Sequence, residues 1–347
     1  APVSVFANVS KLSVCDRQTD WDVEYRFNSS GFRGIEFSVV SQSAQRPILV
    51  LGDSFVFGQG VSEDEAFPRV LQDELLEHGI DLQVVNLGLI GVGPEAYHLV
   101  FRDVGVILKP SVTVLTVFGN DASSNYEPST FRLWLRSLAH HWHLFAMPRV
   151  LHQRFAAQRG RDLTNNADSF WLALSSRCVQ FHSADKCRAF VETFTKRFGR
   201  EINNLAAACL SDPLEVARWV YTDPQSCGWR DFKRYVTKIR DLAVAENSKL
   251  ILAVVADGPQ VDADQLDLRR QLGVAYGDDV LSEPGRFQQL VHGLGVELGI
   301  PVFDSVTGFR GSAGKLFFAS DLHWNARGHR VFAGDLAQFL IDGQHVD

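Results

Sequence analysis

Apolar runs of strand length alternate with helix-like stretches from about residue 48 to the end of the chain. The runs are continuous in apolar character, which is typical of strands buried on both faces of a sheet. They cover residues 48–51, 82–85, 112–118, 249–256 and 301–306. Strands separated by helices favour parallel pairing, with helices on both faces. The pattern therefore predicts an α/β fold, a three-layer α/β/α domain around a five-stranded, flavodoxin-like parallel sheet.

Local signals place three of the covering helices. Ser62-Glu63-Asp64-Glu65 matches a capping box, and apolar residues follow at helical spacing as far as Gly79, so we expect this helix to begin about eight residues after Ser54. Pro94 suits the first position of a second helix, because a missing N–H costs nothing there. Asn325 can cap a last helix, whose apolar positions are Val331, Phe332, Leu336 and Leu340.

Residues 122–245 form a segment too long for a plain connection between two strands. Two apolar stripes at three- and four-residue steps predict helices in it: Phe131, Trp134, Leu135, Leu138, Trp142 and Phe145, then Phe190, Val191, Phe194, Phe198, Ile202 and Leu205. This helical insertion is either a subdomain packed on the sheet or a lid or acyl-binding wall over the functional site. Residues 1–45 show little periodicity, and we expect an N-terminal extension packed on a main domain of residues 46–347.

Composition and charge narrow the classes of partner. Hydrophobic residues make up 46% and charged residues 22%, which is ordinary for a globular protein. A formal net charge of -7 gives no broad attraction to nucleic acid, so we expect no nucleic-acid partner. No stretch reaches the roughly 18 consecutive apolar residues of a membrane span, and we expect no transmembrane segment in this chain. The sequence leaves the oligomeric state open.

Cysteine usage bears on metal binding and on the compartment. Five cysteines, without C-x-x-C spacing or paired histidines, indicate no metal site: Cys15, Cys178, Cys187, Cys209 and Cys227. The last four cluster in sequence and suit one or two disulfides in an oxidising compartment, with five free thiols as the alternative. The chain begins at Ala1, and its one methionine is Met147, which fits removal of a signal peptide or anchor. We expect a secreted or periplasmic protein, with the cytoplasm as the alternative.

Candidate chemistry lies just beyond three of the predicted strands. Gly52-Asp53-Ser54 follows the first run, Asn86 to Gly91 follows the second, and Gly119-Asn120-Asp121 follows the third. The carboxyl ends of parallel strands converge on one crevice, so these segments are expected to share a pocket. A serine nucleophile needs an adjacent base, and the base needs a group that fixes its tautomer. His323 is the candidate base and Asp321 the candidate orienting acid.

These three segments and Asp321-Leu322-His323-Trp324-Asn325 near the C-terminus, in this order, resemble the four signature blocks of the GDSL or SGNH hydrolase superfamily. The resemblance implies a serine esterase or acyl-hydrolase with Ser54, His323 and Asp321 as catalytic residues and no metal or organic cofactor. It also implies an oxyanion hole formed by the backbone N–H of Ser54, the backbone N–H of Gly91 and the side-chain amide of Asn120. Gly88 and Gly93 are the alternatives to Gly91.

The last block departs from the commonest pattern of the superfamily. Most members place the acid three residues before the histidine, as Asp-x-x-His. Here that position is Ser320, and Asp321 stands two residues before His323. The shorter spacing resembles that of SGNH-like enzymes that acylate or deacylate bacterial polysaccharides. Asp53 and Asp121 are expected to form hydrogen bonds within their own loops.

The predicted function is hydrolysis of carboxylic esters through an acyl-enzyme on Ser54. Esterase, acetylesterase and lipase-like activities all fit, with a small-molecule or carbohydrate ester as substrate. One alternative is an O-acyltransferase that moves an acyl group to or from a carbohydrate. The other is an inactive binding module that keeps the fold.

Overall fold

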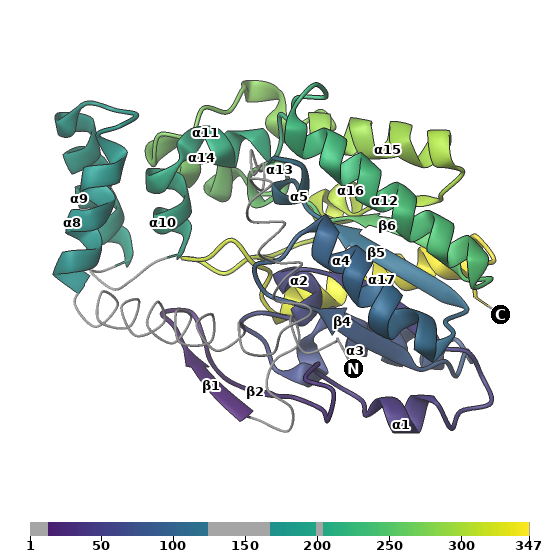
Figure 1. Cartoon of the computed structure of the whole chain (residues 1–347). Helices are drawn as coiled ribbons and strands as arrows, with labels where there is room; N and C mark the ends of the chain where they lie inside the picture. Colours follow the sequence, from purple (N-terminus) through teal and green to yellow (C-terminus); the bar gives the residue numbers. More distant parts are fainter. Residues whose placement is uncertain (1–12, 124–166, 199–203, 347) are drawn as a thin grey trace, which may run out of the picture.

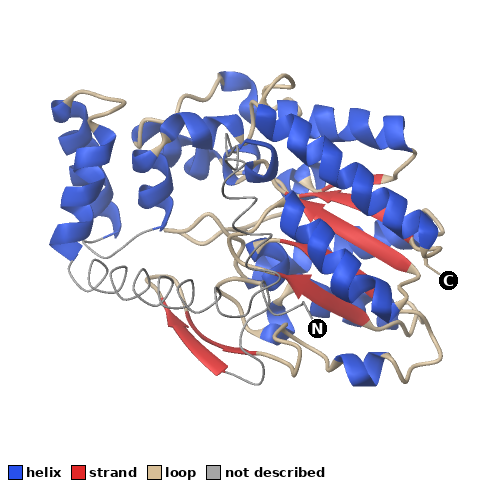
Figure 2. Ribbon diagram, viewed as in Figure 1, coloured by secondary structure: helices blue, strands red, loops and turns tan. Residues whose placement is uncertain are grey.

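A computed structural model describes residues 13–123, 167–198 and 204–346, and its central feature is one parallel sheet. The strands are β3 (Ile48–Gly52), β4 (Val84–Gly88), β5 (Val112–Val117), β6 (Lys249–Val254) and β7 (Val302–Asp304). They pair in parallel in the order β4-β3-β5-β6-β7 (Figure 2). This is the flavodoxin-like order, in which the chain reverses direction across the sheet beside the first strand. The predicted fold class is confirmed.

Helices cover both faces of the sheet, because successive strand side chains point to opposite sides. Ile48 and Val50 of β3 pack in a core with α3 (Phe67–Glu77) and α17 (Ala326–Asp342). Leu49 and Leu51 pack on the other side, in a core shared with three helices: α4 (Pro94–Val100), α12 (Cys227–Ala245) and α15 (Arg286–Leu298). The result is three layers, helix, sheet and helix (Figure 1).

Two of the three predicted helix starts are confirmed. Pro94 occupies the first turn of α4, and the Asn325 side chain accepts the N–H groups of Arg327 and Gly328 at the start of α17. The capping box at Ser62 is present, but it opens only a short 3-10 turn, η2 (Glu63–Glu65), and α3 begins at Phe67. A continuous helix would place Pro68 in its interior, where proline lacks the N–H that the helix needs.

The insertion between β5 and β6 is helical where the structure describes it. It contains α8 (Ala167–Cys178), α9 (Ala184–Phe198), α10 (Asn204–Ser211) and α11 (Pro213–Arg218), followed by α12, which packs on the sheet. Phe194 and Leu205 of the second stripe are fully buried in a separate hydrophobic cluster. The first stripe, from Phe131 to Phe145, lies outside the described residues. In Figure 2 the strand arrows point toward the side of the molecule that carries α8 to α11.

A disulfide joins α8 to α9 through Cys178 and Cys187. Cys15, Cys209 and Cys227 are free thiols. Of the one or two disulfides expected, the structure forms one, and it leaves three cysteines outside a disulfide. Within the described part of the chain, no helix is both long enough and apolar enough to cross a membrane.

The N-terminal region packs on the main domain through a two-stranded antiparallel hairpin, β1 (Ser13–Arg17) and β2 (Asp22–Arg26). The Trp21 ring lies 4.8 Å from the Phe318 ring, and the buried Arg33 donates to the carbonyls of Phe57 and Gly58. The division at residue 45 remains a prediction.

Further helices and turns complete the described part of the chain. They are α1 (Phe37–Val40), α2 (Ser54–Phe57), η3 (Phe101–Gly105), η4 (Val106–Leu108), α5 (Asn120–Ser123), α13 (Gly258–Val261), α14 (Ala263–Gln271), η6 (Asp278–Leu281) and α16 (Val306–Gly311).

Candidate active site

Ser54 is the first residue of the short helix α2, directly beyond the carboxyl end of the inner strand β3. The Asp53 side chain caps this helix by accepting the N–H of Phe55 at 3.0 Å. Glycine is required at position 52, because a Cβ there would lie 2.5 Å from Val56 and 2.9 Å from the Thr116 carbonyl oxygen. The tight turn holds Ser54, which is 8% exposed, at the edge of the sheet where ligands bind in such folds.

A hydrogen-bonded chain connects Ser54, His323 and Asp321. The Ser54 Oγ lies 2.7 Å from His323 Nε2, although the two residues are 269 positions apart. His323 Nδ1 lies 2.5 Å from Asp321 Oδ1, which also accepts the His323 backbone N–H at 2.9 Å. With a proton on Nδ1 donated to Asp321, Nε2 is available to accept the serine proton. The structure therefore brings together the three residues predicted as nucleophile, base and orienting acid.

The short Asp-x-His spacing still lets the Asp321 side chain reach the His323 ring, because both residues sit on one tight loop, residues 318–323. The loop is closed at its base by an antiparallel bridge between Phe317 and Trp324 and by the Phe318 N–H, which donates to the His323 carbonyl. Trp324 is fully buried, and the Phe55 ring contacts both the His323 and the Trp324 rings. Aromatic packing thus fixes the loop against the helix that carries the nucleophile.

Opposing effects act on the pKa of His323. Burial disfavours the imidazolium, but the Asp321 carboxylate, its hydrogen bond and the charge of Asp53 favour it more strongly. The net effect raises the pKa of His323 above its ordinary value. A half-buried imidazole next to a carboxylate is suited to hold a proton during a reaction at the serine.

Asn120 begins α5, just beyond strand β5, and lies beside the nucleophile turn. Its Nδ2 is 3.5 Å from Asp53 Oδ2, at the limit of a hydrogen bond. Gly119 packs so closely on the insertion that a Cβ would lie 2.0 Å from the Trp219 carbonyl oxygen. The insertion therefore packs directly against the Asn120 turn, and whether it serves as a subdomain or as a wall of the site stays a prediction.

Asp53 and Asp121 form hydrogen bonds within their own loops, as predicted: Asp53 accepts the Phe55 N–H, and Asp121 accepts the Phe118 N–H at 3.0 Å. Asp121 also accepts the Tyr97 hydroxyl at 2.8 Å, a contact from α4 that the sequence did not indicate. Burial raises the pKa of both carboxyls, and the charge of Asp53 raises the pKa of Asp121 further. The nucleophile turn and the Asn120 turn are thus electrostatically linked.

The three candidate glycines after β4 have different surroundings. Gly88 packs under α2, because a Cβ there would lie 2.2 Å from the Phe57 backbone nitrogen. Gly93 caps α4 and faces Asp121. Gly91 lies in an exposed turn with a φ of +71°, which favours glycine for its backbone conformation, and a Cβ there would meet no atom within 4 Å. Among the described residues no hydrogen bond joins Gly91 to Ser54, and the oxyanion roles of Gly91, Ser54 and Asn120 remain predictions.

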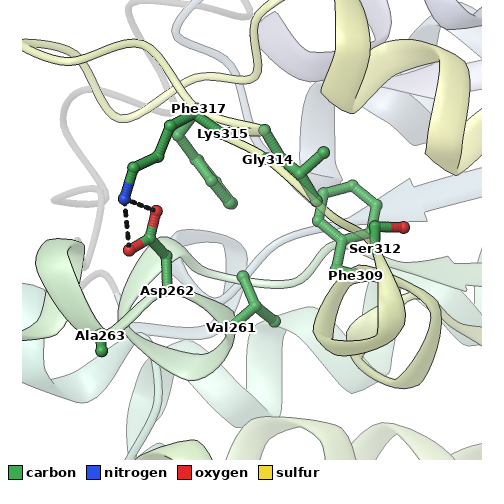
Figure 3. Close-up of a pocket in the computed structure, with 9 residues that line it drawn as sticks. Val261, Asp262, Ala263, Phe309, Ser312, Gly314, Lys315 and Phe317 are labelled. Atoms are coloured by element: carbon green, nitrogen blue, oxygen red, sulfur yellow. Dashed lines mark hydrogen bonds and ion pairs between the residues drawn. The ribbon is translucent and has the colours of Figure 1, made fainter.

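A pocket of about 260 Å³ lies where the chain enters the loop of residues 318–323, and residues 314–317 form part of its lining (Figure 3). Its lining includes Phe309 and Phe317, and Lys315 forms an ion pair with Asp262 at 3.2 Å beside it. None of its lining residues belongs to the Ser54–His323–Asp321 chain. Elsewhere, the described residues hold no group of three or more His, Cys, Asp or Glu placed to bind a metal ion.

Comparison with known proteins finds chains similar to this one among the solved structures. No protein-family model matches the chain, and no curated protein matches it. A putative lipolytic protein of the G-D-S-L family from Desulfitobacterium hafniense DCB-2 is 12% identical, with a TM-score of 0.41, over 85% of this chain and 99% of that one. The acetyl xylan esterase AlAXEase is 12% identical, with a TM-score of 0.43 and coverage of 85% and 99%. The esterase EstA from Pseudoalteromonas sp. is 10% identical, with a TM-score of 0.40 and coverage of 86% and 99%.

Of these three structures, the first is described as belonging to the G-D-S-L family, whose blocks the sequence resembles. At such identities and TM-scores, the similarities assign no activity to this chain. The proposal made below rests instead on the parallel α/β fold and on the hydrogen-bonded serine, histidine and aspartate at the edge of its sheet.

Proposed function

We propose that this protein is a serine hydrolase that cleaves carboxylic esters through an acyl-enzyme on Ser54. The observation that carries the proposal is the continuous chain of contacts, 2.7 Å from Ser54 Oγ to His323 Nε2 and 2.5 Å from His323 Nδ1 to Asp321. A serine hydroxyl becomes a useful nucleophile when a neighbouring base can take its proton and a third group holds the base in the correct tautomer.

In the proposed reaction, His323 takes the Ser54 proton as Oγ attacks the acyl carbon, and Asp321 stabilises the resulting imidazolium. Collapse of the tetrahedral intermediate releases the alcohol, which receives the proton from His323. Water then attacks the acyl-enzyme in the same way, with His323 as base, and the acid leaves. Negative charge on the carbonyl oxygen would be stabilised by the Ser54 and Gly91 backbone N–H groups and the Asn120 amide, each worth about 3 kcal/mol in comparable enzymes.

A second candidate function keeps the acyl-enzyme and replaces water with a carbohydrate hydroxyl, which would make the protein an O-acyltransferase. It is favoured by the Asp321-Leu322-His323 spacing, which resembles that of SGNH-like enzymes acting on polysaccharides. Slow release of acid in water, accelerated by an added carbohydrate acceptor, would distinguish transfer from hydrolysis.

We also propose a secreted or periplasmic location. The Cys178–Cys187 disulfide supports it, since structural disulfides persist mainly in oxidising compartments. Labelling of free thiols in protein taken directly from the producing cell, before any exposure to air, would test this point. Reduced Cys178 and Cys187 in that sample would contradict the proposed location.

The decisive experiment is hydrolysis of p-nitrophenyl esters, from acetate to palmitate, by the native protein and by Ser54→Ala. We expect turnover by the native protein and a loss on the order of 10⁶-fold in the variant, as for a removed catalytic serine. Ser41→Ala, an exposed serine at the end of α1, is the matched control and should keep native activity.

Equal turnover by the native protein and Ser54→Ala would contradict the proposal. If neither releases p-nitrophenol, a phosphonate probe that labels serine nucleophiles separates the remaining possibilities. Labelling of Ser54 would favour acyl transfer to an acceptor absent from the assay, and no labelling of the folded protein would favour a binding module.

A further inference from the structure

The loop of residues 318–323 carries both the candidate base and the candidate acid, so its position decides whether His323 reaches Ser54. The bridge between Phe317 and Trp324 holds only the base of the loop. The residue immediately before Asp321 is Ser320, which is 4% exposed. The contacts of Ser320 therefore fix the backbone position from which the Asp321 side chain extends.

Ser320 is held from outside the loop through all three of its hydrogen-bonding groups. Its backbone N–H and its hydroxyl both donate to the same carboxylate oxygen of Asp20, at 2.8 and 2.6 Å, across 300 residues of sequence. Its carbonyl accepts the backbone N–H of Leu205, at the start of α10, at 3.3 Å. The N-terminal hairpin and the helical insertion thus meet at the residue that precedes the candidate acid.

The hairpin turn that presents Asp20 is itself well supported. Asp16 accepts the Trp21 indole N–H at 2.9 Å and the Tyr25 hydroxyl at 3.0 Å, and the Tyr25 hydroxyl accepts the Gly60 N–H at 2.8 Å. The Trp21 ring also packs on Phe318, the first residue of the loop. Asp20 is therefore fixed relative to the loop on one side and to the segment after the nucleophile helix on the other.

We propose that Asp20 is a positioning residue for the reaction at Ser54: through Ser320 it sets the place of Asp321 and so the orientation of His323. This inference rests on the proposed function. Hydrogen bonds to a carboxylate are shorter and stronger than neutral ones, and both donors of Ser320 converge on a single oxygen. A displacement of about 1 Å between reacting groups can cost about a hundredfold in rate.

The test compares Asp20→Ala, Asp20→Asn and Asp22→Asn in the full chain. Asp22 lies on the same hairpin, where its exposed ion pair with Arg17 is expected to contribute little, and it serves as the control. In Asp20→Ala we expect kcat for a p-nitrophenyl ester to fall about ten- to a hundredfold with little change in KM. Asp20→Asn should recover much of this loss, because its amide oxygen still accepts both donors of Ser320.

Titration of the His323 ring by NMR gives a second readout that does not depend on turnover. The charged groups that act on His323 are Asp321 on its own loop and Asp53 beside Ser54, and the charge of His323 in turn acts on His329 of α17. If Asp20→Ala lets Asp321 move away, the pKa of His323 should fall, whereas a general loss of folded protein would lower the signal without moving the titration midpoint. Thermal unfolding of each variant provides the folded fraction.

A native His323 titration in folded Asp20→Ala, together with activity equal to that of Asp22→Asn, would overturn the inference. If the native protein cleaves no ester, the proposed function fails, while the His323 titration still decides whether Asp20 positions the loop. If Asp20→Ala does not fold, Ser320→Ala provides the test, since it removes one of the two bonds to Asp20 and should lower the pKa of His323 in the same direction.

Discussion

At the residue scale, the chemistry depends on a balance at His323. Burial alone would leave the imidazole neutral and a weak proton acceptor, while the Asp321 carboxylate at 2.5 Å and the more distant Asp53 favour the protonated ring. The net effect is a raised pKa. In the proposed mechanism His323 must be neutral to act as base, so activity should rise with pH through this raised pKa.

The pH–rate profile of Asp321→Asn tests this balance. Removing the carboxylate leaves burial as the main influence, so the rising limb of kcat/KM should move to lower pH. The remaining activity should be lower on the order of 10⁴-fold, as when the orienting acid is replaced in other catalytic triads. A limb at the native pH would show that Asp321 does not set the His323 pKa.

At the element scale, glycines allow the turns that carry Ser54 and Asn120 to pack against their neighbours. Gly52 lets β3 turn sharply into α2, and Gly88 lets the end of β4 pass under the same helix. Gly119 lets the turn that carries Asn120 approach the Trp219 carbonyl after α11. The helical insertion therefore packs against the turn that carries Asn120.

Gly119→Ala should separate these two elements. Its Cβ would lie 2.0 Å from a backbone oxygen, which cannot move aside as a flexible side chain could. We expect the free energy of unfolding to fall by about 1–3 kcal/mol, the usual cost of overpacking, and ester turnover to fall because Asn120 is displaced. Urea unfolding and the p-nitrophenyl assay measure both effects.

Gly293→Ala is the matched control, because a Cβ at this exposed position in α15 would meet no atom within 4 Å. It should keep native activity and increase helix stability by up to about 1 kcal/mol. Equal unfolding free energies for the two variants would show that the close approach of Gly119 to Trp219 is not maintained in solution.

At the scale of the whole molecule, a buried ion pair supports the region between the sheet and the insertion. Asp257, three residues beyond β6, pairs with Arg269 of α14 at 2.8 Å, and both side chains are almost fully buried. Leu266 and Leu268, on the same helix, pack in the hydrophobic cluster of the insertion. The pair therefore connects the end of a central strand to the helices beside the site.

Asp257→Asn should destabilise the protein strongly, because it leaves the Arg269 charge buried without a counter-ion. Breaking such a pair typically costs about 3–5 kcal/mol. Asp73→Asn breaks the exposed Arg69–Asp73 pair and should cost less than about 1 kcal/mol. Urea unfolding at neutral pH compares the two, and a small effect of Asp257→Asn would indicate that water or a rearranged side chain compensates Arg269.

The sequence by itself predicted the sheet and much of the short-range chemistry, but neither the N-terminal hairpin nor the start of α3. Runs rich in apolar residues predicted all five strands of the sheet, since strands buried on both faces are mostly apolar. Pro94 and Asn325 predicted two helix starts because their effects are local. Ser54, His323 and Asp321 could be chosen because strand ends and motif order place such residues together in a parallel fold.

Only the tertiary structure decided what holds those residues in place. Asp20 lies 300 positions from Ser320, Tyr97 lies on a different helix from Asp121, and Asp257 meets Arg269 only after α13 turns the chain. None of these pairs has a sequence spacing that predicts contact, because each depends on how whole elements pack. The sequence determined which groups could react, and the packing determined how closely they are held.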